Sequence, residues 1–365
     1  MKLSEIAAAR LSSQQIASAK FKKVKDLVAY MGALQSQDYA MSKWAIGLRL
    51  PGSTETQIEK ALDKGEIIRT HVLRPTWHII AATDIYWMLA LSADKIKALM
   101  KTMDKQLGLT EKIFIKSNIL IEKAMRDCNH LTREELTDVL QKAKIPTQGN
   151  RLAHLLERAE LDGIACSGKM NGNKKTYALL SERVPNKKEF SKEESLALLA
   201  KKYFTAHGPA TVEDFSWWSG LTLTKARLGL EMVKSNFIAE KINEQTYWFS
   251  NDLHLPVKHT PSVHLLPAYD EFIISYKDRT AALDAEYHKK VLTVNGIFNP
   301  AIILNGRVAG LWKRSFQNGG VHIETVFFQS TGKTIHSLVE KEANNFGQFV
   351  NMKTSVSHST YQSSS

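Results

Sequence analysis

A unit of two helices and a β-hairpin occurs twice in the middle of this chain, and the repeat limits the possible folds more than any other feature. In the first copy, Thr132 and Glu135 have the spacing of a capping box, which predicts the start of a helix. A second helix is predicted over residues 151–161, and Asn171-Gly172-Asn173 predicts the turn of a hairpin. Two helices and a hairpin in this order are typical of a winged helix.

The same order of elements returns after residue 210. A helix is predicted to start at Thr211, and a second helix and a hairpin follow it at 224–233, 237–240 and 246–249. A unit that recurs in the sequence indicates an array of similar modules. The chain before residue 106 fits a third copy, with helices expected at 24–35, 38–48 and 55–64 and alternating strands within 67–80.

After Pro256 the pattern changes to β-branched runs separated by turn residues. The residues after 353 carry too little apolar surface to fold and are predicted to be disordered. Asn305-Gly306 lies between apolar runs and is the strongest hairpin signal in the chain. Strands are predicted at 262–266, 290–294, 301–312 and 321–328, followed by a helix over 332–346.

We therefore predict an α+β chain in which three tandem winged-helix modules precede a β-rich C-terminal domain. The first module contains the two glutamines discussed below. The predicted boundaries are 1–105, 106–185 and 186–255 for the three winged helices, 256–352 for the β-rich domain and 353–365 for the tail.

Charge and composition limit the class of partner and the compartment. The formal net charge is +12 and the pI is near 9.4, with Lys and Arg spread along the chain. This balance favours a polyanion partner, while a basic protein with no nucleic-acid role is the alternative. No apolar run approaches the roughly 20 residues of a membrane span, and no secretory signal is visible, so we expect a soluble cytoplasmic protein. Cys128 and Cys166 are too few for a disulfide framework or a zinc site, and we expect reduced structural thiols.

Gln35 and Gln37 flank Ser36 and are the first candidates for a functional site. On a continuous helix their side chains would point roughly 200° apart, because each residue advances about 100°. If both side chains converge on one site, the backbone must leave the helix near Ser36. The alternative is that Gln35 caps a helix and Gln37 is solvated.

Four blocks of residues occur in order along the chain: Gly32-Ala33-Leu34-Gln35-Ser36-Gln37, Arg74-Pro75-Thr76-Trp77-His78, Leu266-Pro267-Ala268-Tyr269-Asp270-Glu271-Phe272 with Tyr276-Lys277-Asp278-Arg279, and Gly296-Ile297-Phe298 with Gly306-Arg307-Val308-Ala309-Gly310. With these blocks the sequence resembles the AlkZ-like family of tandem winged-helix DNA glycosylases, over nearly the whole chain. The resemblance implies that Gln35 and Gln37 form the catalytic motif; another branch of the family carries Asp at the second position. Pro75 stands where Gly is usual and Trp77 where Leu is usual, which leaves open a divergent member that has lost activity.

A neutral glutamine cannot act as a strong general base, so this pair can only orient a water molecule. The substrate must then supply the driving force, and an N7-alkylated purine does so because its base leaves as a neutral species. We expect the partner to be double-stranded DNA carrying alkylated bases, bound by a monomer, in the cytoplasm at the bacterial nucleoid. No Gly-rich phosphate loop, metal-ligand cluster or nucleophile elbow is visible, so we expect no cofactor and no metal.

Further candidates contact DNA in this hypothesis. Arg69 and Arg74 are candidates to neutralise phosphates, or are simply solvated. Thr76, Arg279 and Arg307 lie in the matching blocks and are assigned to DNA with them. His78, and more weakly His71, are candidates for a phosphate or lesion contact, or are packed core residues.

Other side chains have a structural interpretation. Asp270 and Glu271 are adjacent on a predicted strand and face opposite sides, which favours a structural ion pair with Lys277 or Arg279 over joint acid/base chemistry. Trp217-Trp218 is expected in the core. A flipped base would need an aromatic pocket, for which Tyr39, Trp44 and Trp77 are the candidates.

A second hypothesis is a non-catalytic winged-helix DNA-binding protein or transcriptional regulator, because winged helices usually bind rather than catalyse. Dependence of activity on Gln35 and Gln37 separates the two hypotheses, since a regulator has no use for that pair.

Overall fold

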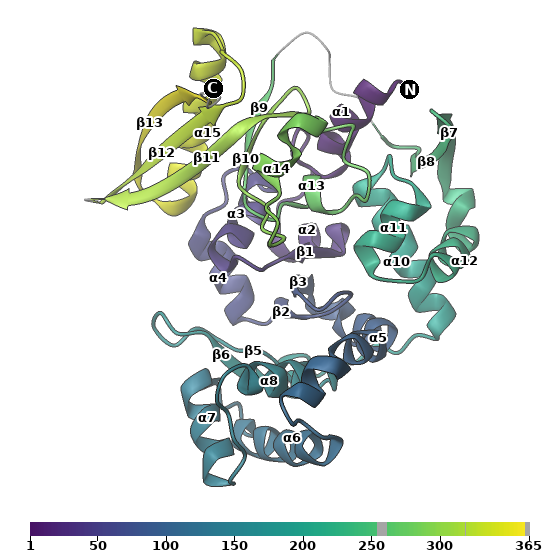
Figure 1. The fold of residues 1–365 in the computed structure, drawn as a ribbon, viewed down its shortest axis with the longest axis vertical. Helices are drawn as coiled ribbons and strands as arrows, with labels where there is room; N and C mark the ends of the chain where they lie inside the picture. Colours follow the sequence, from purple (N-terminus) through teal and green to yellow (C-terminus); the bar gives the residue numbers. More distant parts are fainter. Residues whose placement is uncertain (254–260, 318, 362–365) are drawn as a thin grey trace.

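A computed structural model describes residues 1–253, 261–317 and 319–361 (Figure 1). Within this range, only the backbone is described for residues 3 and 4. Within these residues the strands form four sheets between and beside the helices, which confirms the mixed α+β class. No described helix is long and apolar enough to cross a membrane.

The N-terminal part surrounds a small antiparallel sheet that carries Gln35. The predicted helix over 24–35 is too long: Gly32 has a φ of +79° and ends it, and the next three residues form a strand instead. The elements are α1 (Leu3–Ser13), α2 (Val24–Met31), β1 (Ala33–Gln35), α3 (Tyr39–Arg49), α4 (Glu55–Asp63), β2 (Ile67–His71) and β3 (Trp77–Ala81), with sheet order β1-β3-β2.

Both predicted helix-helix-hairpin units are present in that order. The capping boxes at Thr132 with Glu135 and at Thr211 with Asp214 start their helices. The first unit contains a β4-β6-β5 sheet and the second a β7-β8 hairpin. The assignment of three winged-helix modules and their boundaries stays a prediction. The elements are η1 (Ala82–Asp84), α5 (Ile85–Gln106), α6 (Glu111–Met125), β4 (Leu131–Thr132), α7 (Arg133–Lys142), α8 (Arg151–Leu161), β5 (Ala165–Ser167), β6 (Thr176–Leu179), α9 (Leu180–Arg183), α10 (Lys192–His207), α11 (Val212–Ser219), α12 (Leu223–Val233), η2 (Lys234–Asn236), β7 (Phe237–Ile242) and β8 (Gln245–Ser250).

The C-terminal part is a five-stranded sheet covered by one long helix (Figure 1). The hairpin at Asn305-Gly306 is confirmed. The strand predicted at 290–294 is wrong: residues 288–291 form a short helix that buries Val291, Leu292 forms an isolated bridge with Phe298, and Val294 is fully exposed. The elements are β9 (Val263–Leu266), α13 (Glu271–Ile274), η3 (Ala285–Tyr287), α14 (His288–Val291), β10 (Ala301–Leu304), β11 (Arg307–Gln317), β12 (Gly320–Phe327), α15 (Lys333–Val350) and β13 (Lys353–Thr360), with sheet order β13-β12-β11-β10-β9.

The prediction of a disordered tail is wrong for residues 353–360, which form β13 and pair in parallel with β12. The segment buries little apolar surface, as its composition indicates, but it satisfies its backbone by extending a sheet. Side chains add to this pairing: His322 contacts Ser355 at 2.8 Å and Ser357 at 3.0 Å, and Thr325 contacts His358 at 2.8 Å. Residues 362–365 lie outside the described residues.

The helices of the N-terminal part and the C-terminal sheet share one hydrophobic core. Trp44 on α3 illustrates this: its ring packs on Phe346 and Phe349 of α15, and its Nε1 donates to the carbonyl of Leu265 on β9 at 2.8 Å. Trp44 is therefore a core residue. Segments more than 200 positions apart are held together next to the strand that carries Gln35.

Candidate functional site

Gln35 is the last residue of β1 and is 6 % exposed. It is held through both its backbone and its side chain. The backbone N–H donates to the Glu271 carboxylate at 2.6 Å, and the side-chain oxygen accepts from Nη2 of Arg74 at 2.9 Å. An amide oxygen has a second lone pair, so Gln35 keeps the capacity to accept a further hydrogen bond.

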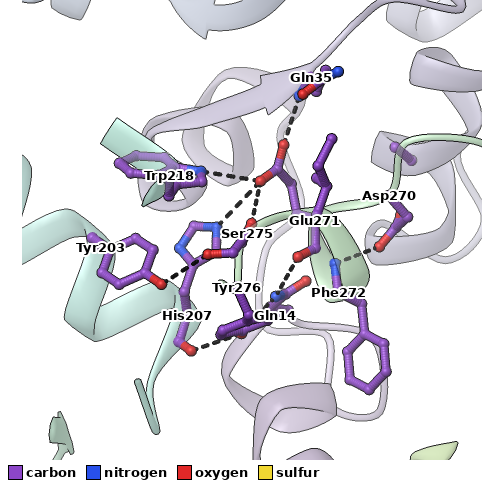
Figure 2. A network of polar contacts seen from close by, with 12 residues as sticks. Gln14, Gln35, Tyr203, His207, Trp218, Asp270, Glu271, Phe272, Ser275 and Tyr276 are labelled. Carbon is purple, nitrogen blue, oxygen red and sulfur yellow. Dashed lines mark hydrogen bonds and ion pairs between the residues drawn. The ribbon is translucent and has the colours of Figure 1, made fainter. Parts of the chain in front are cut away.

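Glu271 is a fully buried carboxylate that collects donors from several elements (Figure 2). Besides Gln35 it accepts from Nε1 of Trp218 at 3.0 Å and from the hydroxyl of Ser275. Burial by itself raises the pKa of Glu271, but the neighbouring His207, whose Nε2 lies 3.8 Å from the carboxylate, the hydrogen bond from Ser275 and the charge of Arg74 outweigh it and lower the pKa to about 2. Glu271 is therefore an anion near neutral pH.

Asp270 has a different role from its neighbour. It caps α13 and forms a two-point ion pair with Arg49 at 2.8 and 2.9 Å, fully buried on both sides. The predicted pairing of this acidic pair with Lys277 or Arg279 is wrong. The reason is that Asp270 and Glu271 begin a helix and turn inward, instead of lying on a strand with one side chain exposed.

Ser36 joins the two glutamines and is fixed by Arg69. Arg69 donates from Nε to the Ser36 hydroxyl at 3.0 Å and from Nη2 to the Ser36 carbonyl at 3.0 Å. The guanidinium lies 3.8 Å from the centre of the Trp77 ring. Arg69 was predicted to meet phosphate; here its hydrogen bonds are made inside the protein, and burial lowers its pKa to about 10, which keeps it charged near neutral pH.

Gln37 is exposed and follows in the turn before Asp38, which caps α3 through the N–H of Met41 at 3.0 Å. The backbone thus departs from the helix before Gln35, at Gly32, and not at Ser36. Gln37 lines an open groove of about 660 Å³. The other main walls of this groove are Tyr39, Lys175, Tyr269 and Phe298.

A small cavity of about 50 Å³ adjoins the groove, because Tyr39 and Lys175 line both. Arg69 and Trp77 also line it. The Lys175 ammonium lies 4.6 Å from the centre of the Tyr39 ring. Of the three aromatic residues predicted for a base pocket, the structure therefore brings Tyr39 and Trp77 together and leaves Trp44 in the core.

Trp77 is supported from behind by His71, whose ring centre lies 3.9 Å away. Nδ1 of His71 lies 2.5 Å from the Glu160 carboxylate, which also accepts the His71 backbone N–H at 3.1 Å. His71 is thus a packed and paired residue that joins β2 to α8.

The remaining residues predicted to contact DNA differ in their exposure and in their distance from the groove. His78 faces Gln35 across the β1–β3 pair, but it is fully buried and its pKa falls to about 3 through burial, so it is neutral and presents no surface. Thr76 is half-buried. Arg279 lies 5.4 Å from the Trp217 ring and 5.2 Å from the Phe298 ring, which places it near the groove wall. Arg307 is paired with Asp284.

Sequence reasoning missed Lys175 and Tyr269, which line the groove, and the anchoring role of Glu271. Lys175 follows the hairpin turn predicted from the sequence, and its position beside that turn was a signal that could have identified it. Tyr269 has a φ of +58°, a conformation that no sequence pattern announces. Trp218 is buried as expected, whereas Trp217 is 43 % exposed. Among the described residues no cluster of His, Cys, Asp or Glu has the arrangement to hold a metal ion.

Three comparisons with known proteins, by family model, by sequence and by structure, each match DNA glycosylases. A family model described as DNA glycosylase AlkZ-like matches residues 28–349. The "Interstrand DNA cross-link repair glycosylase" of Streptomyces sahachiroi is 23% identical over 336 residues, which cover 87% of this chain and 88% of that protein. The solved structure of Streptomyces sahachiroi DNA glycosylase AlkZ matches with a TM-score of 0.80 and 19% identity, over 98% of this chain and 99% of that chain. The last likeness shows a shared fold.

Proposed function

Because this chain belongs to the AlkZ-like family of DNA glycosylases, we propose that it hydrolyses the N-glycosidic bond of alkylated purines in double-stranded DNA. The expected lesions are of the N7-alkylguanine type and include interstrand crosslinks. The crosslink part rests on the name of the Streptomyces sahachiroi relative, and the N7 part rests on the chemistry of the two glutamines.

Alkylation at N7 gives the purine a positive charge. When the bond between the sugar carbon C1′ and N9 breaks, the electron pair goes to the base and neutralises it. The oxygen of a water molecule then bonds to C1′, and that water loses a proton to solvent. A side chain that orients the water is sufficient for this step, because the substrate already carries the activating charge.

The observation that carries the proposal is the way the Gln-Ser-Gln segment is held. Gln35 is fixed by Glu271 and Arg74, and Ser36 by Arg69, while Gln37 stays exposed at the groove. A water between the two amides would meet one rigid and one adaptable partner. A regulator that only binds DNA has no need for a buried carboxylate and two arginines around a short strand.

The test is base release from a duplex that carries one 7-methylguanine, scored as alkali-labile abasic sites. Gln35→Ala and Gln37→Ala should each reduce single-turnover release by about 100-fold with DNA affinity unchanged, if their role is to position water. Gln348→Ala is the matched control, because Gln348 is an exposed glutamine on α15. Full release by both site variants would contradict the assignment.

If the wild-type protein binds the duplex without releasing the base, the same assay is repeated with a crosslinked duplex. Release there would narrow the lesion class. No release from either duplex would favour the non-catalytic DNA-binding protein.

A further inference from the structure

A hollow of about 530 Å³ lies between the segment that leads into α2 and helix α4. It is separate from the groove beside Gln37, with which it shares no lining residue. Its most conspicuous feature is five exposed lysines, three of them just before α2 or in its first turn, and two in the last turn of α4 or directly after it. We call it the lysine hollow, after Lys22, Lys23, Lys25, Lys60 and Lys64.

The charge of the lysine hollow is not neutralised within the described residues. None of its five lysines forms an ion pair or stacks on an aromatic ring there, and Glu66 is the one carboxylate that lines the hollow. Lys43, on the neighbouring α3, contrasts with them, since it pairs with Glu55 and Glu59 of α4 at 2.7 and 2.6 Å. Positive charges that lie close together without acidic partners raise the local electrostatic potential and favour the binding of an anion.

Helix α4 connects this hollow to the candidate site. Lys60 of α4 and Lys64 directly after it line the lysine hollow, whereas Leu62 and Asp63 of α4 line the small cavity beside Tyr39. A nine-residue helix is only about 14 Å long, so both features fall within roughly one turn of a DNA duplex. A duplex that lies over the glutamines can therefore extend past α4.

We infer that the lysine hollow binds the phosphate backbone of the substrate duplex, on one side of the damaged base. This rests on the proposed function, in which the chain acts on duplex DNA. Lysine contacts phosphate as a flexible point charge, which suits backbone contacts that do not depend on sequence. Five ammonium groups from two segments suit a row of phosphates better than a single small anion.

The test is the salt dependence of binding to an undamaged duplex. In a duplex of roughly 25 base pairs, each phosphate contact contributes about 0.9 to the slope of log affinity against log salt concentration. The double variant Lys60→Gln/Lys64→Gln should reduce the steepness of this slope by nearly two and weaken binding about tenfold near physiological salt. All four side chains changed here and in the control are exposed, so the fold is expected to survive, as checked by thermal unfolding.

The control is Lys112→Gln/Lys123→Gln, which removes two exposed lysines from α6. It should leave the slope nearly unchanged, and Lys60→Arg/Lys64→Arg should retain the wild-type slope. An unchanged slope in Lys60→Gln/Lys64→Gln would overturn the inference. An equal loss in the α6 control would also overturn it, because the effect would then reflect total charge.

This readout is independent of base release. If release fails but the slope falls as expected, the lysine hollow still binds DNA and only the proposed activity is wrong. If release depends on Gln35 and Gln37 but the slope does not change, the activity stands and the inference fails.

Discussion

Glu271 is the residue that sets the position of Gln35. Its carboxylate receives a backbone N–H from β1, an indole N–H from α11 and the hydroxyl of Ser275, which directly follows α13 (Figure 2). An acceptor with only donors around it is best ionised, which agrees with its low pKa. Fixing a catalytic candidate by its main chain leaves the side chain available for substrate.

Glu271→Gln would place an amide NH₂ among these donors. We expect a loss of about 1–3 kcal/mol in the free energy of unfolding near neutral pH and a clear decrease in base release. A carboxylate whose pKa is lowered on folding stabilises the protein above its ordinary value of 4.5, and the benefit is lost as pH falls toward about 2. The difference between wild type and variant in urea unfolding should therefore shrink between pH 5 and pH 3. A difference independent of pH would contradict the role of the charge.

Among the residues, Gln35, Gln37, Arg69 and Arg74 could be selected as candidates from motif order and residue type, but their contacts with one another were not predicted. The sequence did not reveal that Arg69 faces inward to Ser36. The local sequence pattern around a basic residue on a strand is the same whether its partner is a phosphate or a carbonyl, because tertiary packing determines the partner.

Among the elements, those with a local start or stop signal were predictable. Thr132 and Thr211 cap their helices as their spacing indicates, because a capping box is completed within four residues. The strand β1 and the strand β13 were missed, since each depends on a partner strand elsewhere in the chain. Apolar periodicity carries no information about such partners.

The packing of α3 on α15 depends on Gly47. A Cβ atom there would lie 2.5 Å from the Phe349 ring. Gly47→Ala should destabilise the fold by about 1–2 kcal/mol in chemical denaturation, because overpacking outweighs the better helix propensity of alanine. If Phe349→Leu is added, the double variant should lose less free energy of unfolding than the two single variants lose together. Simple additivity would show that the two residues do not press on each other.

For the whole molecule, the residues that hold Gln35 and those that line the groove all come from one chain. We propose that one copy of the chain is sufficient for activity. We therefore expect the protein to sediment as a single species of 41.1 kDa, and to bind a duplex with one lesion in a one-to-one complex. Activity that rises with the square of protein concentration would contradict this expectation.

The contact between Gln35 and Glu271 spans 236 positions of the chain. During synthesis, β1 leaves the ribosome long before the carboxylate that orders it exists. The glutamines therefore gain their fixed geometry only after α13 has been translated. A chain that stops before Glu271 would lack both the carboxylate that orders Gln35 and the C-terminal part of the shared hydrophobic core, so premature termination should yield a protein that releases no base.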